Sequence, residues 1–313
     1  MSTPPHRVLS HLPVRAFARF ADDFPEVSFI EVPREGDLPP DVQGEALLSF
    51  TWGSPNMKQV LERGVRWVHT LGTGIDGFPV ETLGDRTLTC ARGSSAVPMS
   101  EWTLAMMLAF EKQLPDTWVR EVPESWNSAR LGGLQGRTLG LVGLGGIGVA
   151  IAERALCFGM RVRAIRRSNR PSPLPGIEIA PSLEDLLATA DHVAIVAPST
   201  KATRHLIDGE AFSRMKPGVH LINIARGALI DQEALRHALD EEQVARASLD
   251  VADPEPLPAG HWLYTHPRVF LSPHVSWSMP NAFDVLLRSF ADNLRRYLAG
   301  EPLEGIVDLE AGY

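Results

Sequence analysis

The sequence predicts an α/β protein of two domains, each built on a parallel sheet with helices packed against it. Three observations predict this fold class. The chain has 313 residues, which is the length of two domains of ordinary size. Short apolar runs alternate with helical patterns along most of the chain. Just before the middle of the chain, a glycine-rich turn joins an apolar run to a helical pattern, as in doubly wound sheets.

Composition narrows the class of protein before any motif is considered. Hydrophobic residues make up 44% and charged residues 22% of the chain, which is typical of a soluble globular protein. The formal net charge of -8 argues against nonspecific binding to nucleic acid or to an anionic membrane. Cys90 and Cys157 have no neighbours with metal-ligand spacing, so we expect no metal site and a reducing compartment. The N-terminus lacks the apolar run of a signal peptide, and no stretch approaches the about eighteen apolar residues of a membrane span. A cytoplasmic location is expected.

In the first domain, five runs predict strands and two segments predict helices. The strand runs are RVLS, VSFIEV, ALLSF, RWVHT and RTLTC, and the helices are expected near Val14–Ala21 and Pro55–Arg63. The alternation favours a small flavodoxin-like domain over residues 1–98. The tail from about Pro280 predicts one amphipathic helix closed by a glycine, which is expected to return to this domain, so residues 280–313 are assigned to it.

Residues 99–279 are assigned to the second domain, which begins with a long apolar helix over Met99–Gln113. The segment 114–136 is polar and irregular and contains tryptophans, so it is either an arm that packs on a partner subunit or a plain surface loop. Six strands follow, TLGLVG, RVRAI, HVAIVA, VHLINI, ASLDV and VFLSP, with helices near 145–158, 183–190, 208–215 and 231–240. Asp231 is interpreted as the N-cap of the last of these helices. The pattern predicts a doubly wound dinucleotide-binding domain.

The turn TLGLVGLGGIG places Gly143, Gly145 and Gly148 in GxGxxG spacing, directly after a strand and at the start of a helix. The first glycine allows a tight turn, the second lets a pyrophosphate approach the backbone, and the third lets helix and strand pack closely. Amide groups at the helix N-terminus then face the phosphates. In this context the motif predicts dinucleotide binding, the alternative being a tight structural turn.

The end of the next strand is basic where an acid is the common residue. Arg166 lies 23 positions after Gly143 (166 − 143), close to the spacing of about 20 at which an Asp or Glu binds the adenosine ribose. No acid occurs between Glu153 and Glu178, and Arg166, Arg167 and Ser168 stand there instead. Guanidinium groups suit a 2′-phosphate, so NADP(H) is the expected cofactor, with NAD(H) as a possible second one. The alternative is a solvated strand end. Arg161 and Arg163 alternate along the strand and are interpreted as structural or merely solvated.

Five segments together carry a resemblance to a family. They are LGTGIDGF at 71–78, LVGLGGIG at 141–148, NIARGALID at 223–231, LDVADPEPLP at 249–258 and SPHVSW at 272–277. In order and spacing, over nearly the whole chain, they resemble the D-isomer-specific 2-hydroxyacid dehydrogenases. The resemblance implies two α/β domains with a cleft between them and a homodimer formed through the nucleotide-binding domain. The absence of a further domain after the last helix favours the glyoxylate/hydroxypyruvate reductase type over the longer phosphoglycerate dehydrogenases.

Three side chains suit the reduction of a 2-keto acid. Arg226 follows an apolar strand at the sheet edge where ligands bind, and its guanidinium can hold carboxylate and carbonyl oxygens. His274 follows another strand and suits an acid/base role. Glu255 is the candidate partner that keeps His274 protonated, with Asp253 as the rival carboxylate and a solvated loop acid as the other alternative. The resemblance implies the same three roles.

Other positions are assigned by the resemblance. It implies that Asp250 lies near the nicotinamide and that the amides around Thr73 and Gly74 hold the substrate carboxylate. Trp52, Phe78 and Trp277 either line a compact pocket there or are core aromatics. Further cofactor contacts are expected from Gly146, Ile147, Pro198, Thr203 and Ala225. Gly146 departs from the family pattern, in which many members carry a basic or polar residue, and Ser199 replaces the usual leucine without an evident reason.

The sequence therefore predicts an NADP(H)-dependent reductase of small 2-keto acids, such as glyoxylate or hydroxypyruvate, that forms D-2-hydroxy acids. One alternative is a nucleotide-sensing protein that keeps the fold without turnover. Another is an NAD-dependent dehydrogenase of a different 2-hydroxy acid. Oxidation of formate or phosphite is disfavoured by an arginine, glutamate and histidine set that suits a keto acid.

Overall fold

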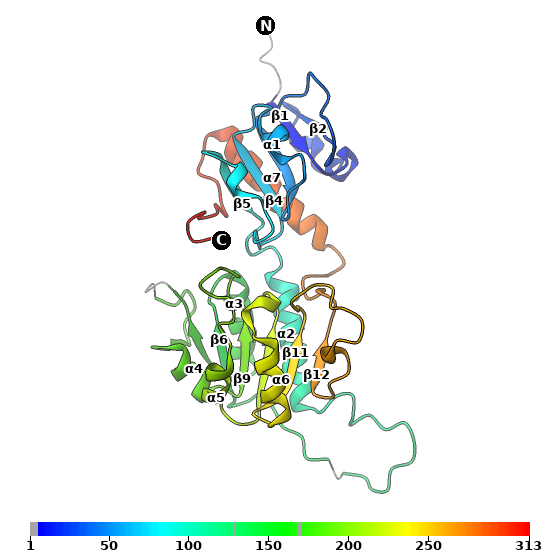
Figure 1. Cartoon of the computed structure of the whole chain (residues 1–313), viewed down its shortest axis with the longest axis vertical. Coiled ribbons are helices and arrows are strands. Elements are labelled where there is room, and N and C mark those ends of the chain that lie inside the picture. The colour runs from blue at the N-terminus through cyan, green and yellow to red at the C-terminus, as the bar shows by residue number, and fades with distance from the viewer. Residues whose placement is uncertain (1–5, 128, 168–170) are drawn as a thin grey trace. The chain divides into compact units, whose positions relative to one another are not determined.

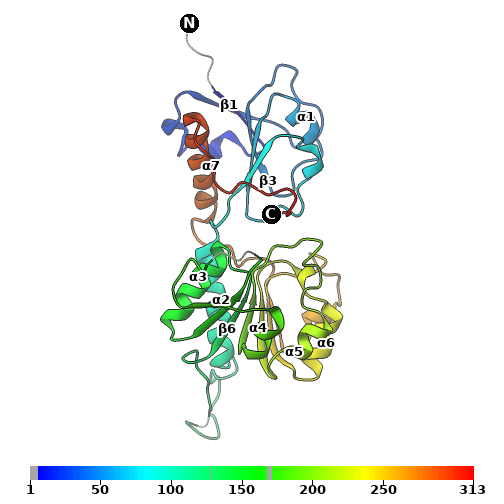
Figure 2. The same cartoon turned by 90° about the vertical axis from the view of Figure 1, so that its left-hand side faces the viewer.

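The computed structural model describes residues 6–127, 129–167 and 171–313. The chain forms two compact units, one comprising the residues up to Ser95 together with Pro280–Tyr313, and the other Ala96–Met279 (Figures 1 and 2). The boundary expected after residue 98 falls in the first turn of helix α2 (Ala96–Glu111). Both units are parallel α/β structures, as the sequence predicts.

The first unit is built on five parallel strands in the order β2-β1-β3-β4-β5, the flavodoxin-like order. The strands are β1 (His6–Ser10), β2 (Val27–Glu31), β3 (Ala46–Phe50), β4 (Trp67–Leu71) and β5 (Thr87–Cys90), so all five predicted runs are strands. Helix α1 (Met57–Leu61) and the 3-10 helix η3 (Val80–Thr82) lie between strands. Helix α7 (Ala282–Ala299) belongs to this unit, and its Phe290 ring stacks on the buried Trp67. It ends at Gly300, whose φ of 69° is left-handed.

The prediction of an α-helix near Val14–Ala21 is wrong. The structure has two short 3-10 helices instead, η1 (Val14–Phe17) and η2 (Ala21–Asp23). Phe17 is the one buried residue of η1, and Val14 is exposed. A single buried side chain does not make the apolar stripe that holds an amphipathic helix against a sheet.

The second unit contains seven parallel strands in the order β12-β11-β10-β9-β6-β7-β8. The strands are β6 (Thr138–Val142), β7 (Arg161–Ile165), β8 (Ile177–Ile179), β9 (His192–Ile195), β10 (Val219–Asn223), β11 (Val244–Leu249) and β12 (Val269–Leu271). Strands β7 and β9 flank β6, so the strand order reverses at β6 and a ligand crevice is expected outside its carboxyl end.

The prediction of six strands omits β8. This strand has three residues, stands at the sheet edge, and buries Ile177 while Glu178 and Ile179 are exposed. Its pattern is too short to separate a strand from a loop. Arg163 of β7 donates to Glu178 of β8 (2.6 Å) and to Asp185 (2.7 Å), which ties this edge together.

Helices cover the two faces of the larger sheet (Figure 2). Helices α2 and α3 (Gly146–Cys157) contribute to one apolar cluster, and α4 (Leu183–Thr189), α5 (Gly209–Arg214) and α6 (Gln232–Asp240) contribute to another. Short 3-10 helices η4 (Gly227–Leu229) and η5 (Trp262–Tyr264) complete the unit. The Asp231 carboxylate accepts hydrogen bonds from two amides of α6, which confirms the predicted N-cap.

The segment after α2 is a long irregular loop, drawn as an excursion from the second unit in Figure 1. It exposes large apolar side chains, with Trp118 63%, Trp126 77% and Val122 93% accessible. Burying such side chains against another surface would be favourable.

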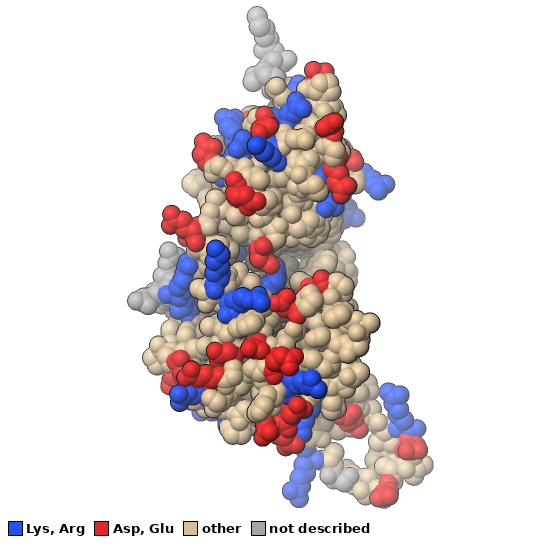
Figure 3. Space-filling view, in the orientation of Figure 1, with Lys and Arg blue, Asp and Glu red and all other residues tan. Residues whose placement is uncertain are grey.

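Acidic and basic side chains are interspersed over the face shown in Figure 3. Among the described residues, no helix combines the length and the apolar character needed to cross a membrane.

Candidate active site

The glycine-rich turn between β6 and α3 has two glycines that packing requires and one that faces open space. A Cβ on Gly143, whose φ is 109°, would lie 2.9 Å from the Ala197 amide nitrogen. A Cβ on Gly148 would lie 2.8 Å from the carbonyl oxygen of Gly143. Gly145 is the N-cap of α3, and a Cβ there would meet nothing within 4 Å. The turn therefore fits a dinucleotide pyrophosphate, because a ligand can approach the backbone at Gly145 and the helix N-terminus.

Next to Gly145, Gly146 is exposed and Ile147 half-buried in the first turn of α3. The loop after β9 is braced by Thr203, whose hydroxyl donates to the Pro198 carbonyl (2.7 Å) and accepts from the Thr200 amide (2.8 Å). Ala225 is buried, and its amide donates to the Asn223 side chain (3.0 Å). All of these residues lie near carboxyl ends of strands of the larger sheet.

The arginines at β7 have different surroundings. Arg163 is held in the ion pairs described above. Arg161 is exposed at the start of the strand. Arg166 and Arg167 follow the strand end, and Arg166 donates to the Pro171 carbonyl (3.4 Å) while the Arg167 side chain is exposed. Ser168 lies outside the described residues.

Arg226 is carried on a short turn after β10. Asn223, fully buried at the end of that strand, donates from its side-chain amide to the Arg226 carbonyl (2.9 Å). The Arg226 guanidinium in turn donates to the Ala225 carbonyl (2.7 Å). A Cβ on Gly227 would lie 2.0 Å from the carbonyl carbon of Ala252, so only glycine lets the two loops touch. The Arg226 turn and the loop that leads to Glu255 are therefore packed against each other.

Glu255 and His274 form a hydrogen-bonded pair. The His274 Nδ1–H donates to the Glu255 carboxylate (2.8 Å), and the Ala252 amide donates to the other oxygen (2.9 Å). Burial alone would raise the pKa of Glu255, but these hydrogen bonds and the charges of His274 and Arg226 lower it below the ordinary value. Because an ionised carboxylate only accepts, Nδ1 carries the proton, and Nε2 is the nitrogen left for proton exchange.

The loop that carries His274 is organised by Asp250. The buried Asp250 carboxylate accepts hydrogen bonds from the Ser272 hydroxyl (2.5 Å) and from the amides of Val275 (2.8 Å) and Ser276 (2.9 Å). The Asp250 carbonyl also accepts from the His274 amide (2.8 Å). The expected proximity of Asp250 to the nicotinamide stays a prediction.

His274 itself has a φ of 55°, in the left-handed region that non-glycine residues rarely adopt. The indole Nε1–H of Trp277 donates to the His274 carbonyl (3.0 Å). The strained backbone is thus held on both sides, by Asp250 through the amide and by Trp277 through the carbonyl.

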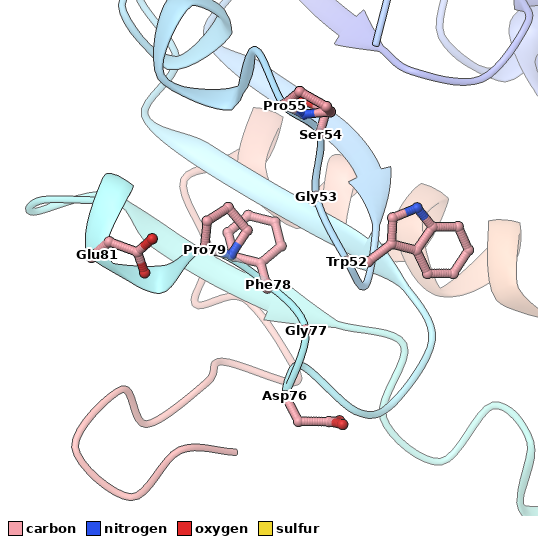
Figure 4. A pocket seen from close by; sticks show the side chains of 9 residues that line it. All are labelled: Trp52, Gly53, Ser54, Pro55, Asp76, Gly77, Phe78, Pro79 and Glu81. Carbon is pink, nitrogen blue, oxygen red and sulfur yellow. The ribbon is translucent and has the colours of Figure 1, made fainter. Parts of the chain in front are cut away.

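In the first unit, the loop after β4 presents backbone amides. Those of Thr73 and Gly74 donate to no other residue in the part of the chain that the structure describes. A pocket of about 500 Å³ next to this loop is lined by residues 52–55, 76–79 and Glu81 (Figure 4). Phe78 is only 5% accessible and belongs to the apolar core, whereas Trp52 is 56% accessible. The Trp52 ring points away from Phe78 and Pro79 in Figure 4.

Sequence reasoning missed Asn223, Gly227 and Ser272 as residues that position the site. Asn223 and Gly227 lie within the NIARGALID segment, and a buried polar residue at the end of an apolar strand is a signal that could have identified Asn223. Nothing in the pattern distinguishes Ser272 from any other loop serine.

We predict that Asp250→Asn loosens the His274 loop. The substitution replaces one carboxylate oxygen by an NH2 group, which would face the hydroxyl and N–H donors of the loop. The free energy of local opening of the loop should therefore fall by about 1–3 kcal/mol. Hydrogen exchange should show about 10-fold to 100-fold faster exchange at the Val275 and Ser276 amides. The matched control Asp253→Asn changes a carboxylate that is 41% exposed and should leave these amides protected. Equal protection in both variants would contradict the account of Asp250.

Comparison with known proteins identifies a family for this chain. Residues 104–276 match the family model described as "D-isomer specific 2-hydroxyacid dehydrogenase, NAD binding domain". The glyoxylate reductase of Thermofilum pendens is 35% identical over 266 residues, which cover 82% of this chain and 76% of that protein. The D-3-phosphoglycerate dehydrogenase of Methanocaldococcus jannaschii is 30% identical over 265 residues, covering 82% of this chain and 50% of that one.

The chain thus spans about half the length of the phosphoglycerate dehydrogenases that it matches. Among solved structures, a D-isomer specific 2-hydroxyacid dehydrogenase from Xanthobacter autotrophicus Py2, in complex with NADPH and MES, has the same fold. The TM-score is 0.84 at 24% identity, covering 99% of this chain and 100% of that one. The chain belongs to the family of D-isomer specific 2-hydroxyacid dehydrogenases.

Proposed function

We propose that the protein is an NADP(H)-dependent reductase that converts small 2-keto acids of the glyoxylate and hydroxypyruvate type into D-2-hydroxy acids. One observation carries the proposal. Arg226, Glu255 and His274 follow three adjacent parallel strands, and the His274–Glu255 hydrogen bond leaves Nε2 as the proton-exchanging atom. The name of the Thermofilum pendens relative, glyoxylate reductase, supports this substrate class.

The residues have complementary roles in the proposed reaction. The reduced nicotinamide of a bound cofactor supplies the hydride that adds to the keto carbon. The Arg226 guanidinium binds the carboxylate and the carbonyl oxygen, where negative charge develops. His274 gives the proton on Nε2 to that oxygen, and Glu255 stabilises the protonated imidazole until then.

Further contacts with the substrate come from other loops. The amide groups of Thr73 and Gly74 bind the substrate carboxylate, which suits donors that have no partner among the described residues. Trp52 of the first unit and Trp277 of the second, 56% and 40% accessible, are the aromatic residues proposed to contact the substrate. Phe78 has a structural role in this proposal, because it is buried in the core.

The cofactor preference rests on Arg166 and Arg167. Both follow β7, the strand next to the glycine-rich turn, and no acid replaces them there. Two guanidinium groups would bind the 2′-phosphate of NADP(H), which an acid at this position would repel. NAD(H) is then the poorer cofactor.

We also propose that the protein is a homodimer formed through the second unit. The exposed Trp118, Val122 and Trp126 on the irregular loop supply apolar surface of the kind that a second copy buries.

Sedimentation velocity should give a dimer for the purified chain, and Trp118→Ser with Trp126→Ser should weaken the dimer. A monomer at every accessible concentration would contradict this part of the proposal.

We predict that Glu255→Gln shifts the pH profile of keto acid reduction. Above its lowered pKa, Glu255 is negatively charged and helps His274 to keep its proton. Without that charge, the protonated imidazole is less stabilised, so the alkaline limb of kcat/KM should move to lower pH. The control Asp253→Asn should leave the limb in place. A shift in the control and none in Glu255→Gln would assign the role to Asp253.

Steady-state kinetics with both cofactors test the preference for NADP(H). Replacing Arg166 and Arg167 by alanine should lower kcat/KM for NADPH about 10-fold to 100-fold, because charge-assisted hydrogen bonds are lost. The value for NADH should change little, and Arg161→Ala is the matched control from the same strand. Equal use of the two cofactors by the parent protein, unchanged by the double substitution, would defeat the cofactor claim. Binding of NADPH without reduction of any 2-keto acid would favour the nucleotide sensor.

A further inference from the structure

A cation is stacked on two aromatic rings in the first unit. The Arg34 guanidinium carbon lies 4.8 Å from the Phe50 ring centroid and 5.8 Å from that of Trp52. The two rings are themselves stacked, with centroids 5.0 Å apart and an interplanar angle of 9°. Stacking fixes the plane of the guanidinium while its N–H edges remain able to bind an anion.

The charge of Arg34 is not neutralised within the unit. Arg34 is exposed, and it makes no ion pair with a carboxylate in the described part of the chain. Its charge acts on the nearest histidine, because burial first and the Arg34 charge second lower the pKa of His11 to about 4. His11 is therefore neutral at pH 7 and adds no second positive charge.

The stack stands where a flavodoxin-like sheet binds its ligand. In the order β2-β1-β3-β4-β5, successive strands are added on opposite sides of β1, so the strand order reverses between β1 and β3. His11 follows β1, Arg34 follows β2, and Trp52 follows β3, so all three lie at the carboxyl edge around this switch point. Ligands of such sheets bind in the crevice outside that edge.

The stack is also next to the loop proposed to hold the substrate carboxylate. Strands β3 and β4 are hydrogen-bonded with Phe50 opposite Leu71, so the segments that leave them start side by side. A Cβ on Gly72 would lie 2.6 Å from the Thr51 side chain, and one on Gly77 would lie 3.5 Å from the Cβ of Trp52. The segment that follows β3 thus contacts Arg34 through Trp52 and the loop after β4 at Gly72 and Gly77.

We propose that Arg34, held on Phe50 and Trp52, binds a second anionic group at the far end of the substrate. Among small 2-keto acids, those with a second anionic group at the far end, a carboxylate, sulfonate or phosphate, are then preferred over their monoanionic counterparts. This inference rests on the proposed function, since it assumes that the Thr73–Gly74 amides hold the first carboxylate. A guanidinium suits all three terminal groups because its N–H fork matches their paired oxygens.

Matched substrate pairs test the inference. Oxaloacetate is compared with 2-oxobutyrate, sulfopyruvate with pyruvate, and 3-phosphohydroxypyruvate with hydroxypyruvate, all at one cofactor concentration. Arg34→Gln removes the charge, Arg34→Lys keeps it, and Arg7→Gln makes the same charge change at the start of β1. Arg34→Gln should lower kcat/KM for the dianion of at least one pair about 10-fold, the loss of one charge-assisted hydrogen bond. The monoanions should be unaffected, and the Arg7 variant should retain the preference. Arg34→Lys, which keeps the charge but loses the planar fork, should retain only part of the preference.

The outcomes separate the two proposals. Reduction of both members of every pair with ratios unchanged by Arg34→Gln would overturn the inference and leave the proposed function intact. A preference for longer apolar keto acids would likewise overturn it and assign the exposed Trp52 ring to an apolar tail. If no keto acid is reduced, the proposed function fails, and calorimetric titration with D-malate and D-2-hydroxybutyrate decides the anion subsite. Tighter binding of D-malate that Arg34→Gln abolishes supports the subsite, and equal binding of the two acids excludes it.

Discussion

The buried carboxylate of Asp250 is the interaction on which the candidate active site depends. It accepts three hydrogen bonds from the segment that follows β12, and its own amide donates to the carbonyl of Asn223 at the end of β10. One residue at the end of β11 therefore links the loops on both sides of it. A buried carboxylate with every oxygen satisfied is stable, whereas one that lost these donors would carry an uncompensated charge in the interior.

From that link the positions of the proposed catalytic groups follow. His274 can adopt a left-handed backbone because its amide is held by Asp250 and its carbonyl by Trp277. Glu255 reaches the imidazole from the loop after β11, and this loop passes directly over Gly227, next to Arg226. The three proposed catalytic side chains come from three adjacent strand ends, and their spacing is set by the sheet and by contacts between backbones. Such a site is pre-organised, which is the condition for electrostatic stabilisation of a developing charge.

Most of the fold was predictable because its elements have strong patterns. Continuous apolar runs marked the buried parallel strands, and the glycine-rich turn marked the reversal of the larger sheet at β6. The short edge strand β8 and the 3-10 turn at Val14–Phe17 were missed, because an element with one buried side chain leaves almost no periodic signal.

The roles of Asp250 and Ser272 depend on loops that meet only in the folded chain. The sequence could name Glu255 and His274 as partners, but not the contacts that hold them. The packing of Phe78 in the core was equally undecidable, since an aromatic residue in a loop has the same pattern whether buried or exposed.

The most direct test of the account is the fate of the hydride. Reduction of glyoxylate and hydroxypyruvate with NADPH that carries deuterium at both C4 positions of the nicotinamide should place one deuterium on C2 of the product, as mass spectrometry would show. The product of hydroxypyruvate should have the D configuration, and His274→Asn with the fold intact should lose nearly all of this transfer. Absence of deuterium at C2, an L product, or undiminished transfer in the His274 variant would contradict the account.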